Sequence, residues 1–440
     1  MNTEGGDESI KYSERSIAPF ETYIEHLLSF LKYLRVLRKE NTFSLSKIFL
    51  ITFAIAVLLS ANVLLVISEI LLVPGNLDIE RLANTINPLG LHISGLVKWI
   101  YCLCKSKEIN ELVTDLDRCY SLSKKIDSSN ECDLPKIEME NVCKNSRMWL
   151  YGWVTVCVYG TVQWCFNALF QKLYNNQIDI LENDTLVYTS PLPYITWQPW
   201  SIETGYGYAS TFLIQFVGAV SSAIGVSCYD SLHVSIFMVL CGQLQCLHLL
   251  LIDIDSVIGT REIEEKLEKK LRYCVDHHTA ILKISRDLET FANLPMFIQC
   301  IETIIIICLL SFEMSTVQFN TDSESMMKLF SLMEYFSAVS LQLYVFCFYA
   351  TRIYFLSLRI ADSVYACGWE LAMYDKIENT SKNKQLSIKM RHSLLLFLLR
   401  AQNPIIMTGG PFYILSLETF KSVMSLAVSN AIILRQLSER

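Results

Sequence analysis

The sequence predicts an all-α membrane protein with seven transmembrane helices. Of its 440 residues, 52% are hydrophobic and only 18% are charged, against about 25% charged in an ordinary soluble domain. Charge-free segments such as 148–171 and 204–229 also match the roughly 20 apolar residues with which a helix crosses the hydrocarbon. The formal net charge of −7 provides no overall positive field, which argues against a nucleic-acid partner.

Residues 1–47 precede the first long apolar segment, and we expect an amphipathic helix in them. Apolar residues recur at helical spacing between Phe20 and Leu34, opposite a face of glutamate, lysine and arginine. Such a helix either lies against the cytosolic surface of a helix bundle or senses the membrane. We expect the first arrangement.

The spans follow in order along the rest of the chain. They are predicted at 48–69, 82–104, 148–171, 204–229, 291–312, 329–351 and 408–434. The further apolar segment 231–252 is interpreted as a continuation of the fourth helix below the membrane. Segment 386–399 is too short to cross, and we expect it to form a buried or surface helix.

Lysine and arginine predict the orientation. The N-terminal region and the connections 105–147, 253–287 and 352–400 together hold thirty of these residues, whereas the three alternate connections hold three. The positive-inside bias therefore predicts a cytosolic N-terminus and an extracellular C-terminus.

The predicted outer connections contain no cysteine and include one glycosylation motif. None of the 15 cysteines lies in them, so we expect reduced thiols rather than an extracellular disulfide framework. The longest one contains the sequon Asn183-Asp184-Thr185, which predicts glycosylation of Asn183.

Motifs of known enzyme chemistry are not found in the sequence. It has no HExxH, no phosphate-binding loop, no GxSxG and no set of CxxC pairs. We therefore predict neither an enzyme nor a bound metal or cofactor. A G-protein-coupled receptor or a transporter is an alternative, although the predicted orientation is opposite to that of G-protein-coupled receptors.

The last predicted span carries a stripe of small or polar residues. Its members recur at spacings of three and four: Ser422, Ser425, Ser429, Ile433 and Gln436. Serines of this kind either permit close helix packing or line a water-filled path narrowed by Ile433 and Leu437. A single helix cannot enclose a pore, so the second interpretation needs several subunits.

The C-terminal region resembles that of the insect odorant receptors. The similarity is carried by Gly409-Gly410-Pro411-Phe412 and by Leu415-Ser416-Leu417-Glu418-Thr419-Phe420. The segments 363–369 and 192–200 are also similar to the family's sequences. Val428 and Asn430 depart from it, because tyrosines are common in the family at these places.

The resemblance implies an odorant receptor subunit of a ligand-gated, non-selective cation channel. Such subunits form a heterotetramer with a coreceptor in the plasma membrane of olfactory sensory neuron dendrites, surrounded by membrane lipid. The short connection Arg261–Lys270 is similar to that of the odorant-binding subunit. The pore and gate would comprise Ser429, Ile433, Gln436 and Leu437. A gustatory-type channel that assembles alone is the alternative.

The same resemblance divides the chain into regions. A cytosolic N-terminal segment would occupy 1–47 and helices one to six 48–351. Cytosolic anchor helices would occupy 352–407, and the pore-lining seventh helix with a short outer tail 408–440.

The resemblance also places a pocket for a volatile, mostly apolar odorant between helices two, three, four and six. Cys157, Gly160 and Trp164 match the family's pocket spacing, although ordinary packing also explains a lone tryptophan. From depth alone we nominate His92, Gly95, Phe212, Phe216, Tyr335 and Val339. The loop 191–200 would act as a lid. Three charged residues are expected to have other roles: Glu302 as a structural acid, and Lys98 and Lys421 reaching the membrane surface.

Overall fold

In the part of the chain that the computed structural model describes, seven helices carry the predicted spans. They are α2 (Leu45–Leu72), α3 (Ile79–Cys104), α5 (Leu134–Asn175), α6 (Gly205–Ile252), α7 (Ile263–Thr316), α8 (Ser323–Tyr365) and α11 (Leu417–Ser438). The residues described are 20–37, 44–72, 79–126, 134–175, 178–182, 185–189, 192–252, 263–316, 323–367, 381–410 and 413–438. Each predicted span lies on a separate one of the seven long helices, so the all-α membrane fold is confirmed.

Shorter elements complete the described chain. They are the 3-10 helix η1 (Phe20–Ile24), the helices α1 (Glu25–Tyr33), α4 (Ser106–Ile126) and α10 (Ser381–Ala401), and the hairpins of β1 (Ile178–Glu182) with β2 (Thr185–Thr189) and of β3 (Thr408–Gly409) with β4 (Tyr413–Ile414). Helix α10 includes the segment predicted as too short to cross.

Five of the long helices in the described residues are apolar enough by mean hydropathy to cross a membrane: α2, α6, α7, α8 and α11. Helix α3 falls below that level because it carries polar side chains. Three of these, Asn87, His92 and Lys98, are buried among the other helices. Polar groups in a membrane helix are tolerated where they face protein rather than lipid.

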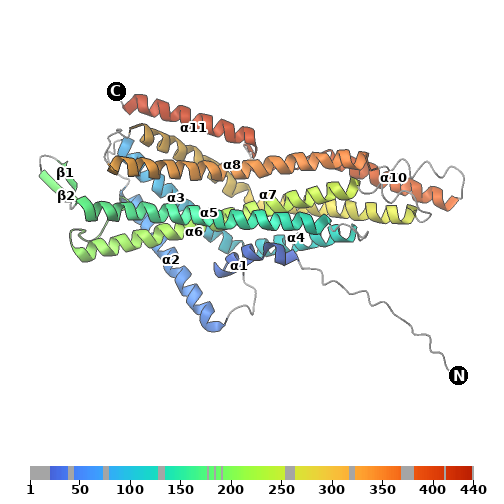
Figure 1. Ribbon diagram of the computed structural model, residues 1–440, viewed down its shortest axis with the longest axis horizontal. Coiled ribbons are helices and arrows are strands. Elements are labelled where there is room, and N and C mark those ends of the chain that lie inside the picture. The colour runs from blue at the N-terminus through green and yellow to red at the C-terminus, as the bar shows by residue number, and fades with distance from the viewer. Residues whose placement is uncertain are drawn as a thin grey trace, which may run out of the picture.

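Helix α6 is the centre of the bundle. It is one continuous helix of 48 residues, which confirms that 231–252 extends the fourth predicted span. It packs against α2, α3, α5, α7 and α8, and it lies lengthwise beside α5 (Figure 1). Nearly every residue from Gly218 to Leu251 is buried. Burial on all sides explains why its sequence shows no amphipathic period.

Small residues let α3 and α6 cross closely. A Cβ atom added to Gly95 would lie 2.3 Å from the backbone oxygen of Ser222, and one added to Gly225 would lie 2.1 Å from the backbone oxygen of Gly95. Both positions therefore require glycine. The crossing holds α3 and α6 together, and both helices contribute residues to the cavity described below.

The described part of the N-terminal segment packs against the bundle. Phe20, Leu27 and Leu31 are almost fully buried, and η1 and α1 contact α5. The His26 Nε2 atom lies 3.0 Å from the Ser146 hydroxyl, which lies 2.8 Å from the Ser235 hydroxyl of α6. Burial, and then the positive charge of Arg147, lower the pKa of His26 from 6.5 to about 4.

Helix α11 begins at Leu417, nine residues later than the predicted start at 408. Gly410 has a φ of 69°, in the left-handed region that favours glycine, and the β3–β4 hairpin turns there. Its backbone N–H donates to the Asn293 carbonyl of α7 at 3.1 Å. The Ser416 hydroxyl then accepts the Thr419 backbone N–H at 3.1 Å, a helix N-cap. The apolar run therefore contains a hairpin followed by a helix.

Candidate functional site

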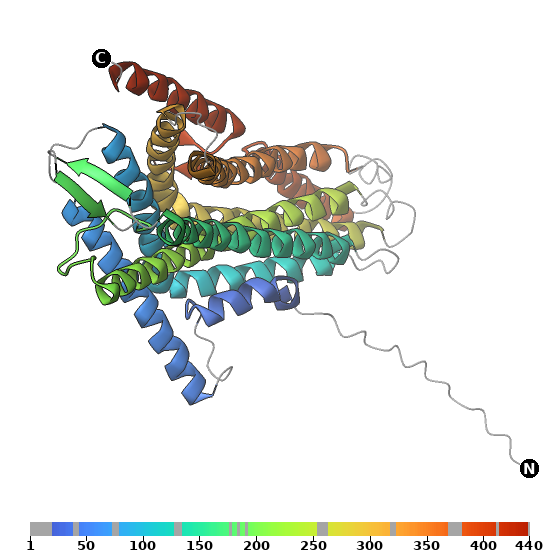
Figure 2. The same ribbon diagram turned by 60° about the vertical axis from the view of Figure 1, so that its left-hand side comes forward.

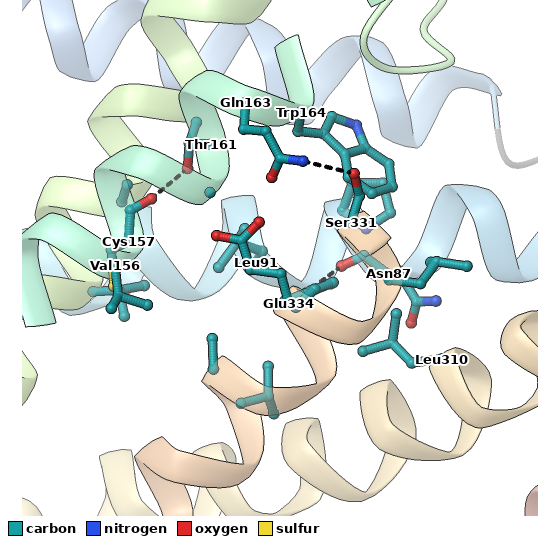
Figure 3. A pocket seen from close by; sticks show the side chains of 18 of the residues that line it. Asn87, Leu91, Val156, Cys157, Thr161, Gln163, Trp164, Leu310, Ser331 and Glu334 are labelled. Atoms are coloured by element: carbon teal, nitrogen blue, oxygen red, sulfur yellow. Dashed lines mark hydrogen bonds between the residues drawn. The ribbon is translucent and has the colours of Figure 1, made fainter. Parts of the chain in front are cut away.

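A cavity lies between α3, α5, α6, α7 and α8. The centre of a water molecule can occupy about 120 Å³ of it, roughly ten times the ~10–15 Å³ that one water requires. The space therefore suits a small organic molecule. Figure 3 shows side chains from α3, α5, α7 and α8 pointing toward this space.

Five of the nine nominated residues line the cavity. Cys157, Gly160 and Trp164 come from successive turns of α5, and Tyr335 and Val339 come from one face of α8. Spacings of three and four place such residues on one side of a helix. The lack of a side chain at Gly160 makes room for the Glu334 carboxyl group, because a Cβ atom there would lie 3.2 Å from Glu334 Oε1.

The other four nominated residues lie elsewhere. Gly95 is used in the α3–α6 crossing. The His92 Nδ1 atom lies 2.9 Å from a carboxylate oxygen of Glu69, in a buried pair. Phe212 and Phe216 stack on each other and pack against an apolar cluster that includes Tyr194 of the cavity wall, but neither lines the cavity. Depth along a helix gave no information about the direction in which these side chains point.

The loop 192–200 is bonded directly to the cavity wall. The side-chain amide of Gln215 on α6 donates to the Tyr194 carbonyl at 2.9 Å and accepts the Tyr194 backbone N–H at 3.3 Å. The Trp164 indole N–H donates to the Pro193 carbonyl at 3.0 Å. Since Tyr194 and Trp164 both line the cavity, the loop forms part of its wall.

The polar lining of the cavity was missed in the sequence. Glu313 and Glu334 both line it, together with amides including Asn87 and Gln163. The signal available in the sequence is spacing: Glu334 follows Ser331 by three residues and precedes Ala338 by four on α8, so it shares a helix face with two lining residues.

An ion pair lies beside the cavity and corrects the prediction for Lys98. Its ammonium group lies 2.9 Å from an Asp230 carboxylate oxygen, and the two side chains are 6% and 0% exposed. Asp230 also accepts the Trp153 indole N–H at 3.2 Å and a hydrogen bond from Gln342. Lys98 therefore faces protein, because Asp230 provides a counter-charge. Lys421, in contrast, is exposed as expected.

The stripe on α11 is left uncovered in the single chain. The side chains of Ser422, Ser425, Ser429, Ile433 and Gln436 are all exposed. The opposite face, Val423, Ala427 and Ala431, is buried. Helix α11 contacts α7 and α8 and runs along the edge of the bundle in both views (Figures 1 and 2).

Two predicted positions lie outside the residues whose surroundings are described. They are Asn183 and the side chain of Leu437. Glu302 is half-buried and does not line the cavity.

These features together define a seven-helix membrane protein with a ligand-sized internal cavity. Residues 78–428 match the family model described as 7tm Odorant receptor. This is most of the chain, and the protein therefore belongs to the odorant receptor family, as the C-terminal resemblance predicts. The family is one of receptors rather than enzymes.

Relatives and solved structures agree with this assignment. Odorant receptor 13a of Drosophila melanogaster is 24% identical over 56% of this chain and 57% of that protein, so the match spans a little over half of its length. Odorant receptor 83a of the same species is 20% identical over 69% of this chain and 70% of that protein. The olfactory receptor OR5 from Machilis hrabei, in complex with eugenol, superposes with a TM-score of 0.72 and 14% identity. That match covers 95% of this chain and 99% of the other, and it shows the fold.

Proposed function

We propose that this chain is the odorant-binding subunit of a ligand-gated, non-selective cation channel that assembles with a coreceptor as a heterotetramer. The cavity is the observation that supports this most strongly. It lies within one chain, its walls come from five helices, and its lining is mostly apolar with a few polar groups, as is typical of small-molecule sites.

Odorant binding is proposed for the nominated residues that line the cavity. Trp164 provides a large apolar wall, Gly160 provides space, and Cys157, Tyr335 and Val339 complete the contact surface. The bonds between this wall and the outer loop make the loop a lid. We expect the lid and α8 to have different positions in the closed and the open channel. An odorant that binds the open form more tightly would shift the equilibrium toward it, by as much as its affinities for the two forms differ.

Helix α8 connects the cavity to α11. Val339 of the cavity wall belongs to the same buried apolar cluster as Ala427 and Ala431 of α11. Farther along α8, the Thr351 hydroxyl accepts the Leu417 backbone N–H at 3.0 Å, at the first residue of α11. A displacement of α8 by ligand would therefore be transmitted to both the middle and the start of α11.

The pore would form where the uncovered stripes of several subunits face one another. Ser429 and Gln436 would contact water and ions, and Ile433 and Leu437 would form an apolar constriction that dewets when closed. The proposed topology has the N-terminus in the cytosol and the C-terminus outside the plasma membrane of a sensory dendrite, with Asn183 glycosylated on the outer side.

Recording odorant-evoked current from cells that express this chain with a coreceptor tests the proposal. We expect current in response to at least one compound of a broad volatile panel. Silence across the panel, with the chain shown at the cell surface, would contradict it. Labelling of intact cells should reach an epitope tag after residue 440 and miss one before residue 1.

Replacing Trp164 by alanine tests the site itself. Loss of the wall and of the lid bond should raise the half-maximal odorant concentration at least about tenfold, which corresponds to ~1.4 kcal/mol. Phe166→Ala is the matched control, since Phe166 is on the same helix but exposed. Equal dose–response curves for Trp164→Ala and the unaltered chain would remove Trp164 from the site.

A further inference from the structure

We propose that the cavity selects odorants that carry a protonated amine, with Glu334 as the counter-charge and the Asn87 and Gln163 side-chain oxygens as hydrogen-bond acceptors. This inference rests on the proposed function, because it names the ligand class of the same cavity. It follows from which hydrogen-bonding atoms of the lining are already in use and which are left without a partner.

Asn87 presents an acceptor that nothing in the described residues uses. The residue is 3% exposed and lines the cavity, and its Oδ1 atom has no hydrogen-bond partner. Its Nδ2 atom donates to a Glu313 carboxyl oxygen at 2.7 Å. A carboxylate accepts hydrogen bonds, so this bond sets the amide orientation and leaves the buried Oδ1 atom without a partner.

Gln163 presents a second acceptor by the same logic. Its Nε2 atom donates to the Ser331 hydroxyl at 3.3 Å, while that hydroxyl donates its own hydrogen to the Met327 carbonyl at 3.0 Å. Ser331 can therefore only accept from Gln163, which fixes the amide with Oε1 outward. That buried oxygen has no partner among the described residues.

Glu334 provides negative charge at the same place. The Glu334 Oε1 atom lies 3.2 Å from the position that a Cβ atom on Gly160 would occupy. Gln163 follows Gly160 by three residues, so Gln163 lies on the same face of α5 that Glu334 approaches. In Figure 3 the Glu334 carboxyl group points into the space toward α5. No hydrogen bond or ion pair of this carboxyl group is found within the described ranges.

Several donors that line the cavity are already committed. The Tyr335 hydroxyl donates to the Asn87 carbonyl at 3.1 Å, and the indoles of Trp164 and Trp153 donate to Pro193 and Asp230. The Thr161 hydroxyl donates to the Cys157 carbonyl at 2.8 Å. An odorant with only a carbonyl oxygen would meet mainly acceptors. A primary ammonium group brings three N–H donors and the missing positive charge.

The remaining cavity surface suits the rest of such a ligand. Leu91, Val156 and Leu310 line the cavity and would provide apolar contacts for the hydrocarbon part of an amine. A carboxylate at membrane depth without a counter-ion is unfavourable by several kcal/mol, so the empty cavity would favour a cation over a neutral ligand of equal size. Alkyl amines are protonated at neutral pH, as lysine is.

Matched compounds that differ only in the polar group test this inference. Amines, alcohols and aldehydes on hexyl, octyl and 2-phenylethyl skeletons would be applied to cells expressing the chain with a coreceptor. On at least one skeleton the amine should act at a concentration at least tenfold lower than the alcohol and the aldehyde. Glu334→Gln should weaken the amine response at least tenfold and the alcohol response less than threefold.

The matched control is Glu302→Gln, a half-buried membrane acid outside the cavity lining, which should keep the amine preference. The inference is overturned if alcohols or aldehydes equal the amines on every skeleton, or if Glu334→Gln leaves the amine response unchanged.

Binding of the same compounds to purified chain, measured by thermal shift, separates the two proposals. Binding of amine that depends on Glu334, without any evoked current, would support the ligand class and contradict the channel. Current evoked by other volatiles, with no amine response or binding, would support the channel and overturn the ligand class.

Discussion

Helices α6 and α11 are both long and apolar enough to cross a membrane, yet α6 is mostly buried and α11 is mostly exposed in the folded chain. In the most apolar stretch of α6, 78% of residues are buried, against 17% in α11. Helix α6 is surrounded by five other long helices, whereas α11 packs one face on α7 and α8. Mean hydropathy high enough for a membrane span therefore accompanies a central, buried helix in one case and a peripheral helix in the other.

The difference indicates where the chain is complete and where it needs neighbours. A helix buried on all sides stabilises its own subunit, and its substitutions should affect folding. In α11 the polar stripe faces away from its own bundle, so these residues contribute little to packing within one chain. Substitutions there should affect assembly or permeation while the subunit remains folded.

The strongest expected effect is at the α3–α6 crossing. Gly225→Val would place a side chain against the Gly95 backbone, and the two helices would have to separate. We expect surface expression to fall at least about tenfold. Gly152→Val is the matched control, because nothing lies within 4 Å of a Cβ there. Surface biotinylation measures both, and normal expression of Gly225→Val would contradict the packing role of α6.

The buried ion pair is the next most sensitive feature of α6. Asp230→Leu would leave the Lys98 ammonium group buried without a counter-charge, and we expect a loss of about 3–5 kcal/mol. The double variant Lys98→Leu/Asp230→Leu should recover most of that loss, since no isolated charge remains. Thermal unfolding in detergent measures the difference. A double variant no more stable than Asp230→Leu would show that the pairing is not the cause.

A smaller effect is expected where the N-terminal segment packs against α6. Folding lowers the pKa of His26 from 6.5 to about 4. Between these two pH values the unfolded chain binds a proton at His26 and the folded chain does not, so the folded state is fully stable above pH ~6.5 and loses stability as the pH falls toward about 4. The loss is at most about 1.4 kcal/mol per pH unit. Hydrogen exchange of residues 20–37, corrected for intrinsic rates, should show falling protection from pH 7 to 5.

His26→Gln is the control for this measurement, because glutamine can bond Ser146 but does not titrate. The variant should lose less protection on acidification than the unaltered chain. Protection of residues 20–37 that is independent of pH in both proteins would contradict the assignment.

The smallest effect on stability is expected on the open face of α11. Ser429→Val should change the unfolding free energy by less than about 0.5 kcal/mol, as is usual for exposed positions, while altering ion permeation. Ala427→Leu, two residues earlier on the buried face, should destabilise the chain by about 1–3 kcal/mol through overpacking. Thermal unfolding and reversal-potential measurements compare them. Equal destabilisation would mean that both faces are packed within the subunit.

Sequence patterns could predict the helices but only part of the site. Hydrophobic length found every long helix and the continuity of α6, because these depend on local composition. The partner of Lys98 lies 132 residues away, and close approach explains Gly95 better than ligand contact does. Such facts depend on which faces meet in the folded bundle. The spacing of Cys157, Gly160 and Trp164 succeeded because one helix face carries all three.

The apolar run after residue 408 shows a second limit. Hydropathy treats it as one span, but Gly410 and the Ser416 cap divide it into a hairpin and α11. Backbone conformation and capping decide where that helix begins, and mean hydropathy contains no information about either.

Thiol modification of Ser429→Cys tests most directly whether the open face of α11 lines a water-filled path shared between subunits. With the unaltered chain as the background control for its native cysteines, a charged, water-soluble thiol reagent applied during odorant stimulation should reduce the current of Ser429→Cys irreversibly. Current through Ser429→Cys that the reagent leaves unchanged, with the same reagent altering an Ile432→Cys variant on the neighbouring exposed face, would contradict the account.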